Sequence, residues 1–132
     1  MVADKENYIY IVAGDEMARL MGEKHTERRI IPFREDLSRG SYDGFSIGPD
    51  FIRERATLWA VSSKEYIEKL EPIINLDTKE AFVLCFGEDE CCRANLEFMI
   101  GYLKAKGYTK PLKVQIVDEY TLELLREYWV EH

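Results

Sequence analysis

The sequence predicts an α/β fold: a three-layer, Rossmann-like domain with a mostly parallel sheet of about four strands and helices on both faces. Two continuous apolar runs, residues 8–13 and 80–87, are typical of strands that are buried on both sides. A helical pattern follows each run, over residues 16–21 and 89–106. The connections between the expected strands are long enough for right-handed crossovers, which favours parallel pairing.

The first part of the chain contains two of the expected strands. Residues 8–13 form the first, and the helix over 16–21 can begin at a cap on Asp15 and end at Gly22. Residues 28–33 form the second, where Pro32 indicates an edge position or a strand end. The glycine-rich stretch that follows, residues 34–49, is typical of a long irregular loop, and such loops are often functional.

The second part of the chain alternates helices and strands up to its end. Its helical segments follow the apolar spacing of an amphipathic helix, and its last strand alternates apolar and polar residues, as expected near a sheet edge. The expected elements are two helices over 50–76 with a new N-cap near Ser62 and Ser63, a strand over 80–87, a helix over 89–106 capped by Asp89, a strand over 112–117, and a closing helix over 121–129.

Composition indicates one globular domain over residues 1–132. Hydrophobic residues make up 46% and charged residues 33%, which excludes a disordered or fibrous chain. The 25 acidic and 18 basic residues give a net charge of −7, which disfavours binding to a nucleic acid. An acidic surface keeps a protein soluble, and it also complements a basic protein partner or a cation.

The cysteines and the N-terminal segment bear on localisation. Cys85, Cys91 and Cys92 are odd in number, and two are adjacent, so we expect free thiols in a reducing cytoplasm. The apolar run after the charged start is too short for a signal peptide, and no stretch approaches the length of a membrane helix. We therefore expect a cytoplasmic protein that does not insert into a membrane.

Carboxylates follow the ends of all four expected strands. In an open parallel sheet, ligands bind outside the carboxyl ends of the strands, so these side chains would gather at one edge. They could hold Mg²⁺, supply an acid–base pair, or simply cap helices, as Asp15 and Asp89 are placed to do. The strand ends are Gly14–Asp15, Arg34–Glu35–Asp36, Gly87–Glu88–Asp89 and Asp118–Glu119.

Arginine and asparagine are the other candidate ligand residues. Arg53 and Arg55 follow Gly48 closely, and one of them could bind a phosphate or carboxylate, although both could also lie on an exposed helix face. Asn95 lies beside the apolar stripe of its helix, where its amide either ties down a neighbouring loop or faces the ligand. Neither a P-loop nor a GxGxxG fingerprint is present, so no dinucleotide cofactor is predicted.

A cysteine nucleophile or a zinc site would need histidine partners. The sequence has only His25, in a charged turn, and His132, the last residue. A Cys–His pair therefore has little support, zinc has too few ligands, and no metal site is predicted. Cys92 lies on the apolar stripe of its helix and is interpreted as a core residue.

Three segments resemble the N-terminal domain of a bacterial family, domain of unknown function 1835 (DUF1835). They are IVAGDE, then DLSRG and FSIGP followed by RERATLW, and VLCFGEDECCRANLEFMIGYL. The family shows H-I-V-x-G-D, D-L-S-x-G-P and W-F-G-x-D-x-x-C-x-N-L at these places. Here Tyr10 replaces the histidine, Cys85 replaces the tryptophan, and the D-L-S-x-G-P motif is divided between two segments. The resemblance implies one shared constellation: Gly14, Asp15, Asp36, Gly48, Pro49, Arg55, Asp89 and Asn95.

These observations favour a protein that binds a small anionic or nucleotide-like ligand at the carboxyl edge of the sheet. The alternative is a non-catalytic, acidic inhibitor or adaptor that presents Tyr120, Tyr128 and Trp129 to a basic partner. A weaker alternative is a metal-dependent phosphodiesterase or nuclease. Both a binding protein and an enzyme fit the sequence. The predicted ligand residues are Gly14, Asp15, Asp36, Gly48, Arg53, Arg55, Asp89 and Asn95.

Overall fold

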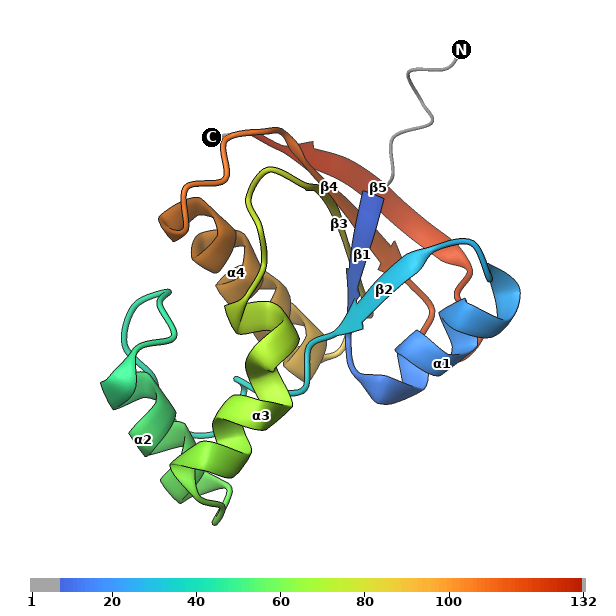
Figure 1. Ribbon diagram of the computed structural model, residues 1–132. Helices are drawn as coiled ribbons and strands as arrows, with labels where there is room; N and C mark the ends of the chain where they lie inside the picture. Colours follow the sequence, from blue (N-terminus) through green and yellow to red (C-terminus); the bar gives the residue numbers. More distant parts are fainter. Residues whose placement is uncertain (1–7, 132) are drawn as a thin grey trace.

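The computed structural model describes residues 8–131, which form a five-stranded, mostly parallel sheet with four helices (Figure 1). The strand order is β2-β1-β3-β4-β5, with parallel pairing up to β4 and antiparallel pairing between β4 and β5. The α/β class is confirmed, and the sheet has five strands instead of about four. The strands are β1 (Tyr8–Val12), β2 (Arg29–Pro32), β3 (Ala81–Phe86), β4 (Leu112–Val117) and β5 (Leu124–Val130).

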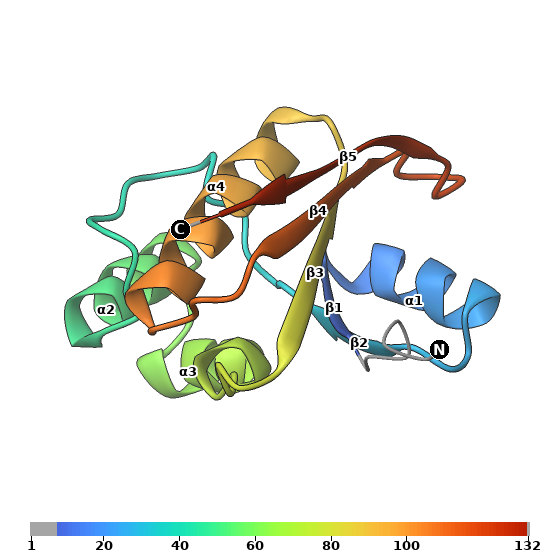
Figure 2. The ribbon, with the colours of Figure 1, turned by 90° about the horizontal axis from the view of Figure 1, so that it is seen from above.

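The four helices lie on the two faces of the sheet. Figure 2 shows α1 (Asp15–Lys24) on one side and α2 (Pro49–Leu58), α3 (Ser63–Ile74) and α4 (Glu90–Ala105) on the other. On the α1 side, Met17 and Met21 pack with residues of β1, β3 and β4. The larger core fills the opposite side. The sheet is covered on both faces at β1 and β3. Successive residues of these strands are therefore apolar, as the continuous apolar runs of the sequence predict.

Local side-chain bonds define two of the helix starts. The Ser62 hydroxyl accepts from the Glu65 N–H and the Glu65 carboxylate accepts from the Ser62 N–H, each at 3.0 Å. Asp89 accepts from the Cys92 N–H at 2.7 Å at the start of α4. These caps satisfy backbone donors that have no partner within the helix, and both predicted positions are confirmed.

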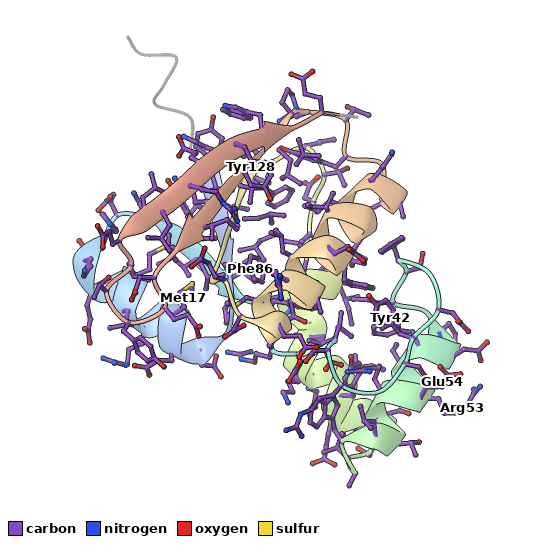
Figure 3. All side chains as sticks on the ribbon, turned by 180° about the vertical axis from the view of Figure 1, so that it is seen from behind. Met17, Tyr42, Arg53, Glu54, Phe86 and Tyr128 are labelled. Atoms are coloured by element: carbon purple, nitrogen blue, oxygen red, sulfur yellow. The ribbon has the colours of Figure 1, made fainter. Side chains whose placement is uncertain are left out.

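The long loop between β2 and α2 is irregular, as predicted, and is held by aromatic packing. Tyr42 meets Phe98 of α4 edge-on, with ring centroids 5.5 Å apart, and Phe98 also stacks on Phe51 of α2 at 5.4 Å. Figure 3 shows Tyr42 between the loop and these helices. The loop is therefore part of the α2–α4 side of the core.

The predicted helix over 121–129 is wrong, because these residues form a turn and β5. Asp118 accepts from the N–H groups of Tyr120 and Thr121 at 2.8 and 2.9 Å, and this turn reverses the chain. Residues 124–130 then pair with β4. Tyr128 and Trp129 also suit a strand, because aromatic residues pack well on a pleated surface.

The start and end of α1 also differ from the prediction. Gly14 occupies the N-cap position with no side chain to cap the helix, and Asp15 is the first helical residue. The helix passes through Gly22 and ends at Lys24. Within residues 8–131, no helix has both the length and the apolar character needed to cross a membrane.

Candidate functional site

Two adjoining hollows lie at the carboxyl edge of the parallel strands. The chain leaves β1 toward β2 on one side and later returns to β3 on the other, which makes this a topological switch point. Ala13, Gly14 and Asp15 line both hollows. The β2 hollow, of about 310 Å³, adds Phe33, Arg34, Glu35, Asp36, Trp59 and Lys69, and the β4 hollow, of about 430 Å³, adds Glu16, Met17, Leu20, Glu119 and Tyr120.

The start of α1 forms the boundary between the hollows. Gly14 has φ +126°, a conformation that side chains rarely permit, and a Cβ there would meet no atom within 4 Å. Because the N-cap is glycine, no side chain accepts from the N–H groups of the first turn. The positive end of the helix dipole therefore faces this edge without a capping side chain.

Arg34 places a cation beside the start of α1. Its Nε donates to Asp15 at 2.8 Å and its Nη1 donates to the Lys69 carbonyl at 3.5 Å. The pair is exposed enough for Arg34 to exchange partners. Of the described residues that line the two hollows, Arg34 and Lys69 are the only basic ones, and both belong to the β2 hollow.

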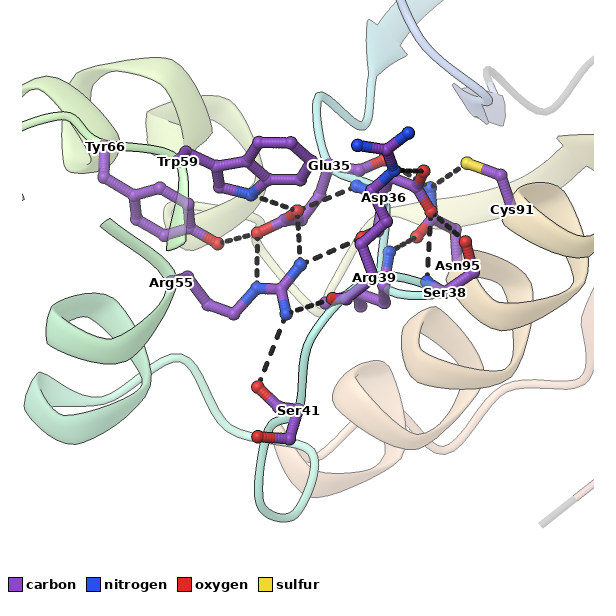
Figure 4. A network of polar contacts seen from close by, with 11 residues as sticks. Glu35, Asp36, Ser38, Arg39, Ser41, Arg55, Trp59, Tyr66, Cys91 and Asn95 are labelled. Atoms are coloured by element: carbon purple, nitrogen blue, oxygen red, sulfur yellow. Dashed lines mark hydrogen bonds and ion pairs between the residues drawn. The ribbon is translucent and has the colours of Figure 1, made fainter. Parts of the chain in front are cut away.

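Glu35 forms a buried ion pair with Arg55 directly behind the β2 hollow (Figure 4). The side chains are 0% and 1% exposed, and two bonds of 2.9 and 2.8 Å join them in a bidentate pair. The Tyr66 hydroxyl and the Trp59 indole N–H also donate to Glu35, at 2.5 and 2.9 Å. Burial raises the pKa of Glu35, but the hydrogen bonds from Arg55 and Tyr66 outweigh it and leave this pKa below its usual value.

The remaining N–H groups of Arg55 bind the loop between β2 and α2. They donate to the carbonyls of Asp36 and Arg39 at 2.9 and 2.7 Å, with a longer contact to Ser41. Arg55 therefore has no N–H group left for a ligand, and the carboxylate that it binds belongs to its own chain. In this structure Arg55 is a structural residue instead of the predicted ligand clamp.

Asn95 fixes the same loop from α4. It is completely buried, its Oδ1 accepts from the Leu37 N–H at 2.9 Å, and its Nδ2 donates to the Glu35 carbonyl at 2.6 Å. Of the two roles open to this amide, the structure supports the tie to a neighbouring loop. The neighbouring Asp36 lines the β2 hollow and accepts from the N–H and hydroxyl of Ser38.

A second group of carboxyl side chains lies after β3 and β4. Carboxyl oxygens of Asp89 and Glu119 and the Cys92 sulfur lie within 4.8 Å of one another, the one such group of potential metal ligands among residues 8–131. Contact with Asp89, together with burial, raises the pKa of Glu119 to about 7, while that of Asp89 is lowered. The pair therefore shares a proton near neutral pH.

The cysteines at the start of α4 are poor nucleophiles. Burial, followed by contacts with the neighbouring carboxylates, raises the pKa of Cys91 and of Cys92 to about 12. Both thiols are protonated at neutral pH. Cys92 is buried in the core, as predicted.

The structure brings together only part of the predicted set. Gly14, Asp15 and Asp36 line the two hollows, and Asp89 lines neither but contacts Glu119 of the β4 hollow. Gly48 lines a separate hollow at the start of α2. Arg53 points away from the protein on the outer side of α2 and pairs with Asp50 at 2.7 Å (Figure 3).

Several residues of this region are absent from the predicted set. Arg34 and Glu119 lie just after the ends of strands. The rule that ligands bind at the carboxyl ends of parallel strands, which selects Asp15 and Asp89, therefore selects them too. Trp59 and Lys69 lie on the crossover between β2 and β3, and nothing in their local sequence marks them. Comparison with family models, curated proteins and solved structures gives no match.

Proposed function

We propose that this protein binds a small anionic, nucleotide-like ligand at the carboxyl edge of its sheet. The carrying observation is the pair of hollows that meet at Gly14, at the switch point between β1 and β3. Their sizes suit a small molecule. The order of the parallel strands, β2-β1-β3-β4, is that of doubly wound folds, which bind ligands at this place, and on this ground we also infer a Rossmann-like fold. The relationship to DUF1835 is inferred from the three sequence segments that resemble that family.

The anionic group would lie in the β2 hollow against the start of α1. Three sources of positive potential lie there, the uncapped N–H groups of the first turn, Arg34 and Lys69, beside the carboxylates of Asp15 and Asp36. The ligand would replace Asp15 as the partner of Arg34, because a phosphate or carboxylate can accept two N–H bonds from one guanidinium. The exposed Asp15 could then turn to solvent.

An aromatic part of the ligand would have Trp59 as its neighbour. This half-buried side chain lines the β2 hollow, and its indole N–H is fixed by Glu35 at 2.9 Å. A fixed ring provides an apolar surface for stacking at little cost in conformational entropy. The buried Glu35 carboxylate would thereby orient Trp59 for binding.

Titration calorimetry with adenosine monophosphate, adenosine and inorganic phosphate tests this proposal, supported by thermal shift. Arg34→Gln is expected to weaken binding of the monophosphate about tenfold by removing a charged hydrogen bond, and Trp59→Leu is expected to weaken adenosine binding. Arg53→Gln is the matched control, because Arg53 is exposed and distant from both hollows. Absence of binding by all three probes, or equal effects of Arg34→Gln and Arg53→Gln, would overturn the proposal.

A further inference from the structure

The β5 strand forms an open edge of the sheet. It pairs with β4 and is last in the strand order, so no strand within residues 8–131 uses the backbone N–H and C=O groups of its other side. At the opposite edge, β2 has only four residues and contains Pro32, which lacks an N–H donor. The seven-residue β5 is therefore the edge better suited to accept another strand.

Large apolar side chains remain exposed along β5. Trp129 is 51% exposed and Tyr128 40%, although they lie in a strand at the end of a sheet that buries both of its faces elsewhere. Leu124 and Leu125 are also exposed. A row of exposed aromatic and leucine side chains beside an open backbone edge is typical of an interaction surface.

A further hollow lies between α4 and β5. The pairing of Tyr128 with Val114 places Tyr128 on the α4 side of the sheet, and Figure 3 shows it on the outer strand. Together with Leu96, Ile100 and Ile116 it lines a hollow of about 450 Å³. Side chains of a strand added next to β5 would alternate between the two faces, so every second one would reach toward this hollow.

The charge of this surface selects its partner. Glu123, Glu127 and Glu131 lie on or beside β5 against Arg126, and Lys113 of β4 pairs with Glu127 at 3.5 Å. The hollow between α4 and β5 adds Glu88 and Glu97 against Arg93, so carboxylates outnumber basic groups on this surface. β5 itself carries Arg126 and Glu127, and two copies paired through β5 would bring the flanking Glu123 and Glu131 of both chains to one edge, which is unfavourable. A strand carrying lysine or arginine would meet opposite charge.

We propose that β5 is a docking edge for an extended, basic segment of a partner protein, which adds to the sheet as a further strand and inserts an apolar side chain into the hollow between α4 and β5. Main-chain hydrogen bonds would supply affinity, and the hollow and the carboxylates would supply specificity. This surface is separate from the two hollows at Gly14 and does not depend on the ligand proposed for them.

Short synthetic peptides of one apolar pattern, with lysine, serine or glutamate at the alternate positions, test the inference. Binding is followed by amide chemical shifts and hydrogen exchange of the full chain. We expect the lysine peptide to protect amides of residues 124–130 and to bind at least tenfold more tightly than the glutamate peptide. N-methylation of the peptide at alternate residues should abolish binding, because it removes main-chain donors without changing the protein.

Protein variants locate the site independently. Tyr128→Ser is expected to weaken the lysine peptide, whereas Ile67→Ser, which changes an exposed apolar residue of α3, should leave it unchanged. The inference would be overturned by no binding at ~1 mM peptide, by equal affinity of lysine and glutamate peptides, or by shifts confined to residues around Gly14. Sedimentation showing a dimer with protected β5 amides would assign this edge to a second copy instead.

Discussion

Glu35 follows β2 and Glu119 follows β4 at the same carboxyl edge of the sheet, yet their surroundings are opposite. Glu35 is buried and accepts from a guanidinium, a phenol and an indole, so its charge is fully compensated. Glu119 has another carboxyl group, Asp89, as its nearest titrating partner, and its pKa is raised to about 7. Position at a strand end therefore does not decide a carboxylate's role. The role of the carboxylate depends on the charge of the side chain that it contacts.

Glu35 forms a buried cluster with Arg55, Tyr66 and Trp59. Removing its cation should have the largest effect on the stability of the protein. Arg55→Met leaves a buried carboxylate without its counter-ion, and we expect a loss of about 3–5 kcal/mol in the free energy of unfolding. Urea denaturation measures this loss. In a double-mutant cycle with Glu35→Met, the double variant should be less destabilised than the sum of the two single variants. Additive losses would show that the two side chains do not act as a pair.

Asn95→Ala should have the next largest effect on stability. It leaves the Leu37 N–H and the Glu35 carbonyl without their side-chain partner, at a cost of about 1–3 kcal/mol for each buried group that water does not reach. Hydrogen exchange should show faster opening of the Leu37 amide than of amides in β3. Unchanged protection of Leu37 would contradict the role of Asn95 as a tie for the loop.

Arg55 and Asn95 both hold Glu35 and the loop between β2 and α2, and the partners in these contacts could not be predicted from the sequence. The α/β class, the buried strands and the caps at Ser62 and Asp89 follow from residues close together in the chain, so local patterns reveal them. The Glu35 cluster joins residues 20 to 31 positions apart, and pairing at that distance leaves no local pattern. The wrong prediction of a helix over residues 121–129 has a related cause. These residues carry a helical spacing of apolar side chains, and only the pairing with β4 selects a strand.

The pH dependence of stability should distinguish Glu119 from Glu35. Because the folded state raises the pKa of Glu119 from 4.5 to about 7, the folded protein holds a proton that the unfolded chain has released. The resulting stabilisation is complete below pH 4.5 and is lost as the pH rises through 7. Glu119→Gln should flatten the fall in melting temperature between pH 5 and pH 7.5.

Asp89 and Asp118 are the other charges acting on Glu119, so the Asp118→Asn variant is the control for general charge effects. It should preserve most of the fall in melting temperature. An equally steep fall in wild type and Glu119→Gln would show that Asp89 and Glu119 do not share a proton.

The smallest effect is expected at Arg53, which the sequence places two residues from Arg55. Arg53→Met removes only an exposed pair with Asp50, so the free energy of unfolding should change by less than about 0.5 kcal/mol. Urea denaturation beside Arg55→Met gives a direct contrast between two arginines of one helix. A loss comparable to that of Arg55→Met would contradict the burial difference between them.

The two tryptophans of the chain provide separate optical reporters. Trp59 donates its indole N–H to Glu35 beside the β2 hollow, while Trp129 lies half exposed on β5. Phenylalanine at either position would leave a single emitter, so fluorescence from Trp59 would follow opening of the crossover helices and fluorescence from Trp129 would follow detachment of the last strand. Stopped-flow unfolding of the two variants would then reveal whether the chain comes apart in one step or from one end.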